Sequence, residues 1–268
     1  MMENQKTKIL HKKLQALAPY AIAYSGGNDS TFLAAISHYF SLNFCLIHCI
    51  SEFTIARDTQ RARIFAREHA IPYYEINLSV MGIVEIVTNN KDRCYYCKKA
   101  VFKKIQECAN SNGFSNIVDA GNVSDTADYR PGRKALAQLG VHSPLLEAGF
   151  TKEDIIKGLQ CLNISYSKTS NSCLATRVPY GTGITQDILD SIRKAEEFIV
   201  SLGFEGVRVR YHYPLARIEV HQDDIHRIVD PVMRDKIVAF CKQLGFLYVT
   251  IDLEGFKSGN LNRMLNHE

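Results

Sequence analysis

Residues 21–36 of the 268-residue chain read AIAYSGGNDSTFLAAI, and this segment decides which fold we expect. The apolar run 21–24 is typical of a buried strand, and the serine and two glycines after it are typical of a tight turn. Apolar residues then recur at helical spacing beyond Asp29, so the segment predicts a strand, a turn and a helix. Such a turn brings backbone N–H groups and the positive end of a helix dipole to one point, where an anion can bind.

Strands and helices continue to alternate after this segment. Short apolar runs between turn signals predict further strands at 44–50, 72–76 and 116–120. Helices are expected between them, at 56–69 and 101–112. Alternating strands and helices predict an α/β fold with a doubly wound parallel sheet.

The second half of the chain has a different rhythm. Turn residues crowd the stretch 125–180, where we expect one helix at 152–162 among loops that bind ligand. A helix, a hairpin, a helix and a strand are then expected at 186–202, 207–221, 230–244 and 246–253. We therefore predict a larger domain over residues 1–180 and a smaller α+β domain over residues 181–268, which serves substrate binding or oligomerisation.

Composition narrows the class of protein. Hydrophobic residues make up 46% of the chain, which is enough to bury a core. No apolar stretch is long enough for a transmembrane helix, and the polar, basic N-terminal segment does not resemble a secretory signal, so a cytoplasmic protein is expected. The net charge of +4 suits phosphate-bearing ligands but is too small to indicate nucleic-acid binding.

The turn at 25–30 contains the side chains that a phosphate site needs. Gly26 and Gly27 permit a sharp turn and a close backbone approach, and the hydroxyls of Ser25 and Ser30 can donate to phosphate oxygens. An acid beside phosphates is useful if it holds Mg²⁺, which is the role we expect for Asp29. No lysine follows the glycines, so this is not a Walker A loop.

Three of the eight cysteines stand out by their positions. Cys94 and Cys97 form a CxxC just before the helix expected at 101–112, and Cys173 lies in the ligand-binding stretch. A closed zinc site needs a fourth ligand that these motifs do not supply, whereas three thiolates can hold a 4Fe–4S cluster with one iron left open. A redox dithiol or structural cysteines remain the alternatives. We expect the other five to fill the core: Cys45, Cys49, Cys108, Cys161 and Cys241.

Several longer strings resemble one known family. The SGGNDS string resembles the PP-loop of the ATP pyrophosphatases, and further strings resemble the LarE family of ATP-dependent sulfur transferases, which serve nickel-pincer nucleotide biosynthesis. These strings are DRCYYCKKAVF (92–102), DYRPGRKAL (128–136), HSPLLEAGFTKEDI (142–155), SCLATRVPYGTGIT (172–185), RVRYHYPLARIEV (208–220) and YVTIDLEGFKSGNLN (248–262). The resemblance implies the PP-loop fold, which is like that of the adenine nucleotide α-hydrolases.

The resemblance also implies a reaction. ATP adenylates a carboxylate of pyridinium-3,5-biscarboxylic acid mononucleotide, and sulfur then displaces AMP. In one branch of the family a single cysteine, here Cys173, gives up its own sulfur; in the other, three cysteines hold a 4Fe–4S cluster whose open iron carries sulfide. Because Cys94, Cys97 and Cys173 complete the three-cysteine pattern, we favour the cluster. The expected partners are the nucleotide substrate, a sulfide or other sulfur donor, and further copies of the chain, since family members form hexamers.

Arginine and glutamate side chains are candidates for the substrate site. Arg177, Arg208 and Arg210 can grip phosphate or carboxylate through paired hydrogen bonds, and alternate residues 208 and 210 share a strand face. We expect Glu196 and Glu219 to line the same pocket. For each of these residues, a solvated surface position is the alternative.

Three further residues are candidates for ligand binding. Lys98, beside the CxxC, can contact phosphate or lower the pKa of a thiol. Asp125 and Tyr129 follow the strand expected at 116–120, at the sheet edge where α/β proteins bind ligands.

Three other functions are compatible with part of these motifs. A PP-loop tRNA thiolase uses similar cysteines, but the chain has no strong basic stripe. An amidase-type PP-loop ligase would use the cysteines as structural zinc ligands. A nucleotide-binding module without catalysis would not need the complete SGGNDS string with Asp29.

Overall fold

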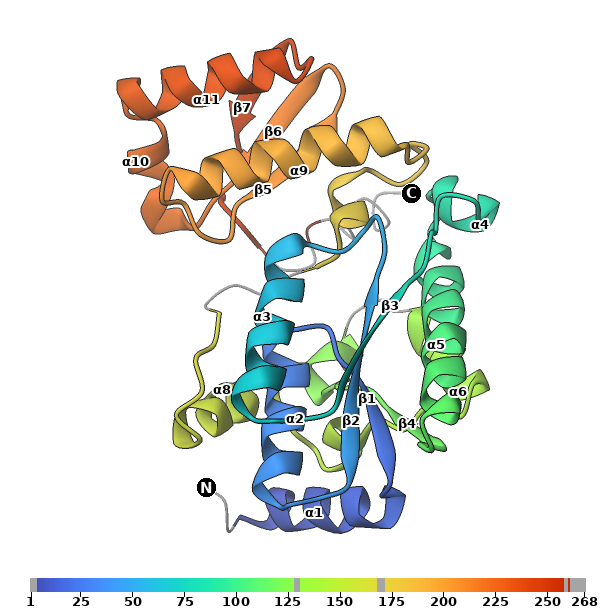
Figure 1. Cartoon of the computed structure of the whole chain (residues 1–268). Helices are drawn as coiled ribbons and strands as arrows, with labels where there is room; N and C mark the ends of the chain where they lie inside the picture. Colours follow the sequence, from blue (N-terminus) through green and yellow to red (C-terminus); the bar gives the residue numbers. More distant parts are fainter. Residues whose placement is uncertain (1–3, 128–130, 168–171, 258–259, 261–268) are drawn as a thin grey trace. The chain divides into compact units, whose positions relative to one another are not determined.

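The computed structural model describes residues 4–127, 131–167, 172–257 and 260 (Figure 1). Contacts divide the chain into two compact units. Unit 1 comprises Met1–Val80 and Asp92–Ser167, and unit 2 comprises Met81–Lys91 and Lys168–Glu268. The domain boundary expected after residue 180 stays a prediction, because contacts alone do not test which part folds independently.

Unit 1 contains the expected parallel sheet. Its strands are β1 (Tyr20–Ala23), β2 (Phe44–Ile50), β3 (Tyr73–Asn77) and β4 (Asn116–Val118), in the order β3-β2-β1-β4. All three strand pairs are parallel. The α/β prediction is therefore confirmed.

Apolar side chains cover both faces of this sheet. Tyr20 and Ile22 of β1 pack into one core cluster, with residues of α2 and α3. Ala21 of β1 and Cys45 of β2 belong to a second cluster, with Phe102 of α5. Since successive strand residues point to opposite faces, the continuous apolar runs reflect burial on both sides.

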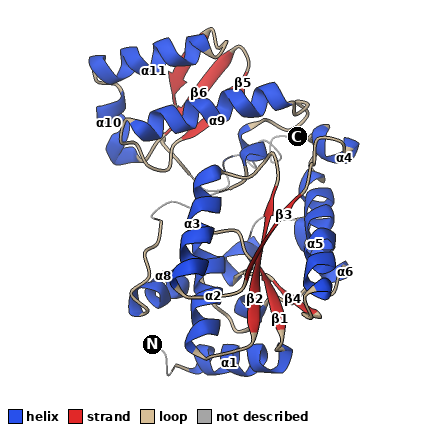
Figure 2. Ribbon diagram, viewed as in Figure 1, coloured by secondary structure: helices blue, strands red, loops and turns tan. Residues whose placement is uncertain are grey.

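Helices lie on either side of the strands (Figures 1 and 2). The helices of unit 1 are α1 (Gln5–Leu17), α2 (Asn28–Tyr39), α3 (Ala56–Glu68), α5 (Arg93–Ser111), α6 (Gly132–Gln138), α7 (Pro144–Glu147) and α8 (Lys152–Cys161), with a 3₁₀ turn η1 (Val123–Ala127). α2, α3 and α8 cover one face, and α5 and α6 cover the other. The short loop between β1 and α2 opens at the carboxyl edge of the sheet, where α/β proteins bind ligands.

Two helices differ from the sequence-based expectation. α5 begins at Arg93, eight residues before the expected start at Val101, so the CxxC lies within the helix. The expectation was wrong because residues 94–100 show no apolar stripe that would indicate a helix. In the structure, α5 packs against α6, a contact that the local sequence does not reveal. α1 was not expected, since only Leu10 and Leu14 among its apolar residues are buried in a lysine-rich sequence.

Unit 2 contains a small mixed sheet. β5 (Arg208–His212) pairs antiparallel with β6 (Leu215–Glu219), and β6 pairs parallel with β7 (Tyr248–Ile251). Its helices are α4 (Val84–Val87), η2 (Leu174–Arg177), α9 (Gln186–Ser201), η3 (Gln222–Asp224), α10 (Ile225–Ile228) and α11 (Pro231–Gln243). The expected helix, hairpin, helix and strand are confirmed.

The two faces of the unit 2 sheet differ in chemistry. Val209, Ala216 and Ile218 form one core with apolar residues of α9 and α11. The register places Arg208 opposite Glu219 and Arg210 opposite Arg217, so the other face carries the charges. No helix in the described parts of the chain is both long and apolar enough to cross a bilayer.

Candidate functional site

The loop between β1 and α2 has a conformation that requires glycine. Gly26 has φ 76°, and a Cβ there would lie 2.3 Å from the carbonyl oxygen of Asp58. Gly27 is the N-cap of α2 with φ −80°, and its Cβ would meet only the Ser25 hydroxyl, at 3.4 Å. The loop can therefore tolerate a side chain at residue 27 but not at residue 26.

Hydroxyl groups fix the shape of this loop. The oxygens of Ser25 and Ser30 lie 3.1 Å apart, and Ser30 donates to the Gly27 carbonyl at 3.1 Å. The Gly27 N–H in turn donates to the Ser25 hydroxyl at 3.3 Å. Because first-turn amides of a helix have no intrahelical acceptor, the start of α2 offers donors to an anion beside these hydroxyls.

The Asp29 carboxylate is hydrogen-bonded to Asn122, in the segment that follows β4. Nδ2 of Asn122 donates to Oδ2 of Asp29 at 3.0 Å, and Asn122 is 1% exposed. An ionised carboxylate only accepts hydrogen bonds, so the amide must turn its nitrogen toward Asp29. Asn122 Oδ1 is left buried with no hydrogen-bond partner among the described residues. A carboxylate next to an unsatisfied amide oxygen fits the oxygen-donor preference of Mg²⁺.

Cys94 and Cys97 lie in the first two turns of α5, three residues apart on one helix face. Both are partly exposed. The ammonium group of the neighbouring Lys98 lies 3.9 Å from Oδ2 of Asp119, the residue that follows β4. The thiols and the lysine thus lie at the same sheet edge as the loop at residues 25–30, called the phosphate loop below. Two partly exposed thiols on one helix face can supply part of the ligand set of a metal cluster. Among the described residues, no three cysteine, histidine or acidic side chains lie together closely enough to hold a metal ion.

Four of the other five cysteines are wholly or partly buried. Burial raises the pKa of Cys45 to about 12 and those of Cys49 and Cys241 to about 11, so these thiols stay protonated and unreactive. The expectation that Cys161 fills the core is wrong. This thiol is exposed because it ends α8 outside the face that buries Ile155 and Leu159.

Cys173 lies in unit 2, at the N-cap of η2. The residue is exposed, whereas Leu174 and Ala175 behind it are buried. Its carbonyl accepts hydrogen bonds from the Thr176 hydroxyl at 2.7 Å and from the Arg177 guanidinium at 3.1 Å. The cysteine is therefore presented on an anchored loop. The three candidate cysteines are divided between the two units.

Three of the charged side chains on this face of the unit 2 sheet are buried, not solvated. Arg208 is 2% exposed, Arg210 6% and Glu219 0%. Arg210 donates to Glu219 Oε2 at 2.6 Å and to the Thr176 carbonyl at 2.9 Å. Arg208 donates to the Val207 carbonyl at 2.9 Å and lies over the ring of Phe256. Their predicted contact with substrate anions stays a prediction.

Arg177 and Glu196 form a paired contact in unit 2. Arg177 Nε lies 2.8 Å from Glu196 Oε1, and Nη2 lies 3.1 Å from Oε2. His212, at the end of β5, lies near charges of both signs. Burial is the main cause that lowers its pKa, the charges of Arg217 and Arg210 lower it further, and that of Glu219 raises it.

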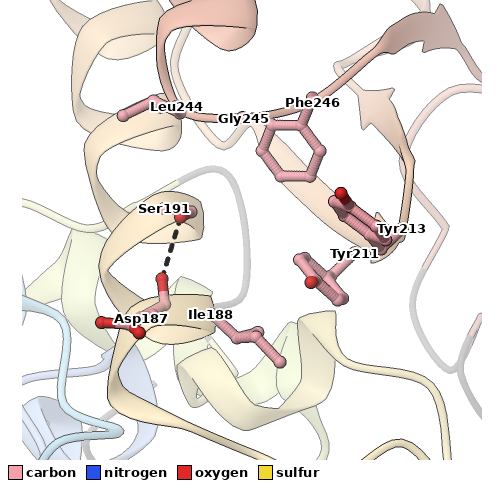
Figure 3. A pocket seen from close by; sticks show the side chains of 8 residues that line it. All are labelled: Asp187, Ile188, Ser191, Tyr211, Tyr213, Leu244, Gly245 and Phe246. Atoms are coloured by element: carbon pink, nitrogen blue, oxygen red, sulfur yellow. Dashed lines mark hydrogen bonds between the residues drawn. The ribbon is translucent and has the colours of Figure 1, made fainter.

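A pocket lies elsewhere in unit 2, among α9, the β5–β6 hairpin and the end of α11 (Figure 3). The side chains of Tyr211, Tyr213 and Phe246 line its aromatic side. Asp187 and Ser191 line the helical side, where the Ser191 hydroxyl donates to the Asp187 carbonyl at 2.8 Å. None of the predicted site residues is among the eight that line it.

Sequence reasoning missed Asn122 as a site residue. The available signal was its place just beyond a strand at the carboxyl edge of the sheet. Asp125 follows at the same edge, within η1, and lies 3.4 Å from the ammonium group of Lys152. Tyr129 lies outside the described residues, as do parts of the strings at 128–136 and 248–262.

Comparisons with known proteins cover nearly the whole chain. No profile of a known protein family matches it. It is 34% identical over 263 residues to the pyridinium-3,5-bisthiocarboxylic acid mononucleotide synthase of Lactiplantibacillus plantarum, covering 97% of this chain and 95% of that protein. It is 35% identical over 246 residues to an uncharacterised Synechocystis protein, covering 91% and 92% of the two chains. An uncharacterised Methanocaldococcus jannaschii protein is 31% identical, covering 96% of each.

Proposed function

The chain belongs to the LarE family of pyridinium-3,5-bisthiocarboxylic acid mononucleotide synthases, and from this membership we propose its reaction. A carboxylate of pyridinium-3,5-biscarboxylic acid mononucleotide attacks the α-phosphorus of ATP, and pyrophosphate leaves. A sulfur nucleophile then attacks the activated carbonyl carbon, and AMP leaves. The product is a thiocarboxylate of the nickel-pincer precursor. Activation is needed because a carboxylate is a poor electrophile, whereas AMP is a good leaving group.

The phosphate loop would carry the first step. Amides at the start of α2 would donate to the pyrophosphate oxygens as negative charge develops. The hydroxyls of Ser25 and Ser30 would donate as well, once they turn away from their partners within the loop. Asp29, aligned by Asn122, supplies the carboxylate for Mg²⁺, which neutralises phosphate charge when bound. The glycine-dependent loop, with Asp29 at the start of α2, is the observation that carries the proposal.

The three cysteines would serve the second step. We assign Cys94, Cys97 and Cys173 to a 4Fe–4S cluster, which supplies an open iron for carrying sulfide when bound. Support comes from the residue types, the shared helix face of Cys94 and Cys97, and the exposure of Cys173. Lys98 and the two strand arginines, Arg208 and Arg210, are proposed to bind the phosphate and carboxylates of the substrate. Glu219 would position Arg210 through their ion pair.

A comparison of the two half-reactions tests this assignment. Asp29→Ala should abolish substrate-dependent pyrophosphate release, while Cys173→Ala should retain ATP binding and pyrophosphate release but form no thiocarboxylate. Normal pyrophosphate release by Asp29→Ala would remove the loop from the mechanism. Normal thiocarboxylate formation by Cys173→Ala would remove Cys173 from sulfur transfer.

Metal content tests the sulfur carrier. Protein purified without oxygen should contain about four iron and four sulfide ions per chain, and Cys173→Ala should lose them. Cys45→Ala is the control, because Cys45 is buried in the core of unit 1 and should cost only packing. Zinc in place of iron would favour a structural site. No metal, together with conversion of Cys173 to dehydroalanine during turnover, would make Cys173 itself the sulfur donor.

We also propose that the chain forms a homo-oligomer, a hexamer by analogy with the family. Light scattering of the purified protein tests this, and a monomer at all concentrations would contradict it.

A further inference from the structure

Arg177 is enclosed by the protein, whereas an arginine that binds substrate needs a free N–H group. Its side chain is 0% exposed. Nε and Nη2 are both engaged by the Glu196 carboxylate. Nη1 contacts the Ser172 carbonyl at 2.7 Å, the Ser172 hydroxyl at 2.9 Å and the Cys173 carbonyl at 3.1 Å. It also lies 3.0 Å from the hydroxyl oxygen of Thr176. Every nitrogen of the guanidinium group is therefore engaged by the protein.

Glu196 ties this arginine to the sheet. Its Oε1 also accepts a hydrogen bond from the backbone N–H of Val209 in β5, at 2.9 Å. A buried ion pair is stable only when its geometry is good and its remaining polar atoms are satisfied. The bidentate pair, the strand amide and the loop acceptors meet that condition. Arg177 and Glu196 thus connect β5 to the loop that carries Cys173.

A second arginine, Arg210, also holds this loop. The Thr176 carbonyl accepts from Arg210 Nη1 at 2.9 Å, and the Thr176 N–H donates to the Cys173 carbonyl at 3.0 Å. Leu174 is 1% exposed and Ala175 0%, whereas Cys173 itself is exposed. The loop backbone is therefore fixed on its buried side, and the cysteine is displayed on its open side.

We propose that Arg177, paired with Glu196, is a positioning residue that fixes the Cys173 loop for sulfur transfer, and that it does not bind the substrate anion. An anion could reach the guanidinium only by displacing Glu196 or the loop carbonyls. This inference rests on the proposed function, since it assigns Cys173 to the second step. Two residues of one short segment thus have different roles. Cys173 takes part in sulfur transfer, and Arg177 fixes the backbone that carries Cys173.

Two variants test the proposal. Arg177→Lys keeps the charge but cannot form the bidentate pair or span the loop acceptors. Glu196→Gln keeps the shape of the carboxylate partner and removes its charge, and it serves as the second variant should Arg177→Lys fail to fold. Arg193→Lys is the matched control. Arg193 lies on α9, as Glu196 does, but its ion pair is with Asp190 and is partly exposed.

The readouts are the two half-reactions and hydrogen exchange. For both test variants we expect an unchanged substrate KM in pyrophosphate release, thiocarboxylate formation slower by on the order of tenfold or more, and faster amide exchange in residues 172–178. The control should match wild type in all three. A raised substrate KM with unchanged amide exchange would overturn the proposal and make Arg177 a substrate ligand. If the wild-type protein releases no pyrophosphate, the proposed function fails, and amide exchange in the variants still decides whether Arg177 fixes the loop.

Discussion

At the scale of single residues, Gly26 sets the shape of the phosphate loop. Its positive φ and the nearby Asp58 carbonyl exclude a side chain, while Gly27 next to it has an ordinary backbone conformation. Gly26→Ala should therefore lower the free energy of unfolding by about 2 kcal/mol or more, and Gly27→Ala by much less. Thermal or urea unfolding without ATP measures both. Equal losses for the two variants would show that the loop does not depend on the conformation of Gly26.

Asn122 is a second single-residue determinant, because it orients the Asp29 carboxylate. Groups that orient a metal ligand typically change metal affinity by 10- to 100-fold when removed. For Asn122→Ala we expect the Mg²⁺ concentration that supports half-maximal pyrophosphate release to rise about tenfold. Asn116→Ala is the control, since the Asn116 amide contacts the Leu17 carbonyl elsewhere in unit 1. An unchanged Mg²⁺ requirement in Asn122→Ala would contradict a role beside the cation.

At the scale of elements, His48 joins β2 to the end of β1 and to α3. Nδ1 lies 2.8 Å from the Tyr24 carbonyl and must donate to it, and Nε2 lies 2.9 Å from the Thr59 hydroxyl. Burial lowers the pKa of His48 below its ordinary value, and the hydrogen bond to Tyr24 opposes this shift only in part. Among nearby charges, Glu75 and Asp58 raise the pKa and Arg63 lowers it. The imidazole is therefore neutral in the folded protein.

Because the unfolded chain binds a proton on His48 more readily than the folded protein does, acid should destabilise the fold. Stability should fall as pH drops below about 6.5, the ordinary histidine pKa, by up to about 1.4 kcal/mol per pH unit. His48→Gln should flatten this dependence, and His226→Gln, at an exposed position, should leave it unchanged. Urea unfolding between pH 5 and pH 7.5 measures the slopes. A slope in His48→Gln equal to that of wild type would assign the acid sensitivity to other groups.

The elements with a clear apolar pattern were predictable from sequence. β2 occupies 44–50 as predicted, because its continuous apolar run is buried on both faces. The start of α5 was not predictable, because its first turn packs against α6, a helix from a distant part of the sequence. Local periodicity cannot indicate a contact of that kind.

At the scale of the whole molecule, the candidate residues divide between two units. The phosphate loop, Cys94, Cys97 and Lys98 belong to unit 1, and Cys173 with the buried arginines belongs to unit 2. Sequence reasoning found the phosphate loop because its residues are contiguous. It could place Arg208 and Arg210 on one strand face but not foresee their burial, since Thr176 and Phe256 come from segments far along the chain.

In the proposed reaction, this chain uses ATP to replace a carboxylate oxygen of the nucleotide substrate with sulfur. The most direct measurement is mass spectrometry of the nucleotide after incubation of anaerobically purified protein with pyridinium-3,5-biscarboxylic acid mononucleotide, Mg²⁺·ATP and sulfide. We predict a product heavier by the exchange of one oxygen for one sulfur, formed together with AMP and pyrophosphate and absent without ATP. An unchanged nucleotide mass, with ATP intact, would contradict the proposed function.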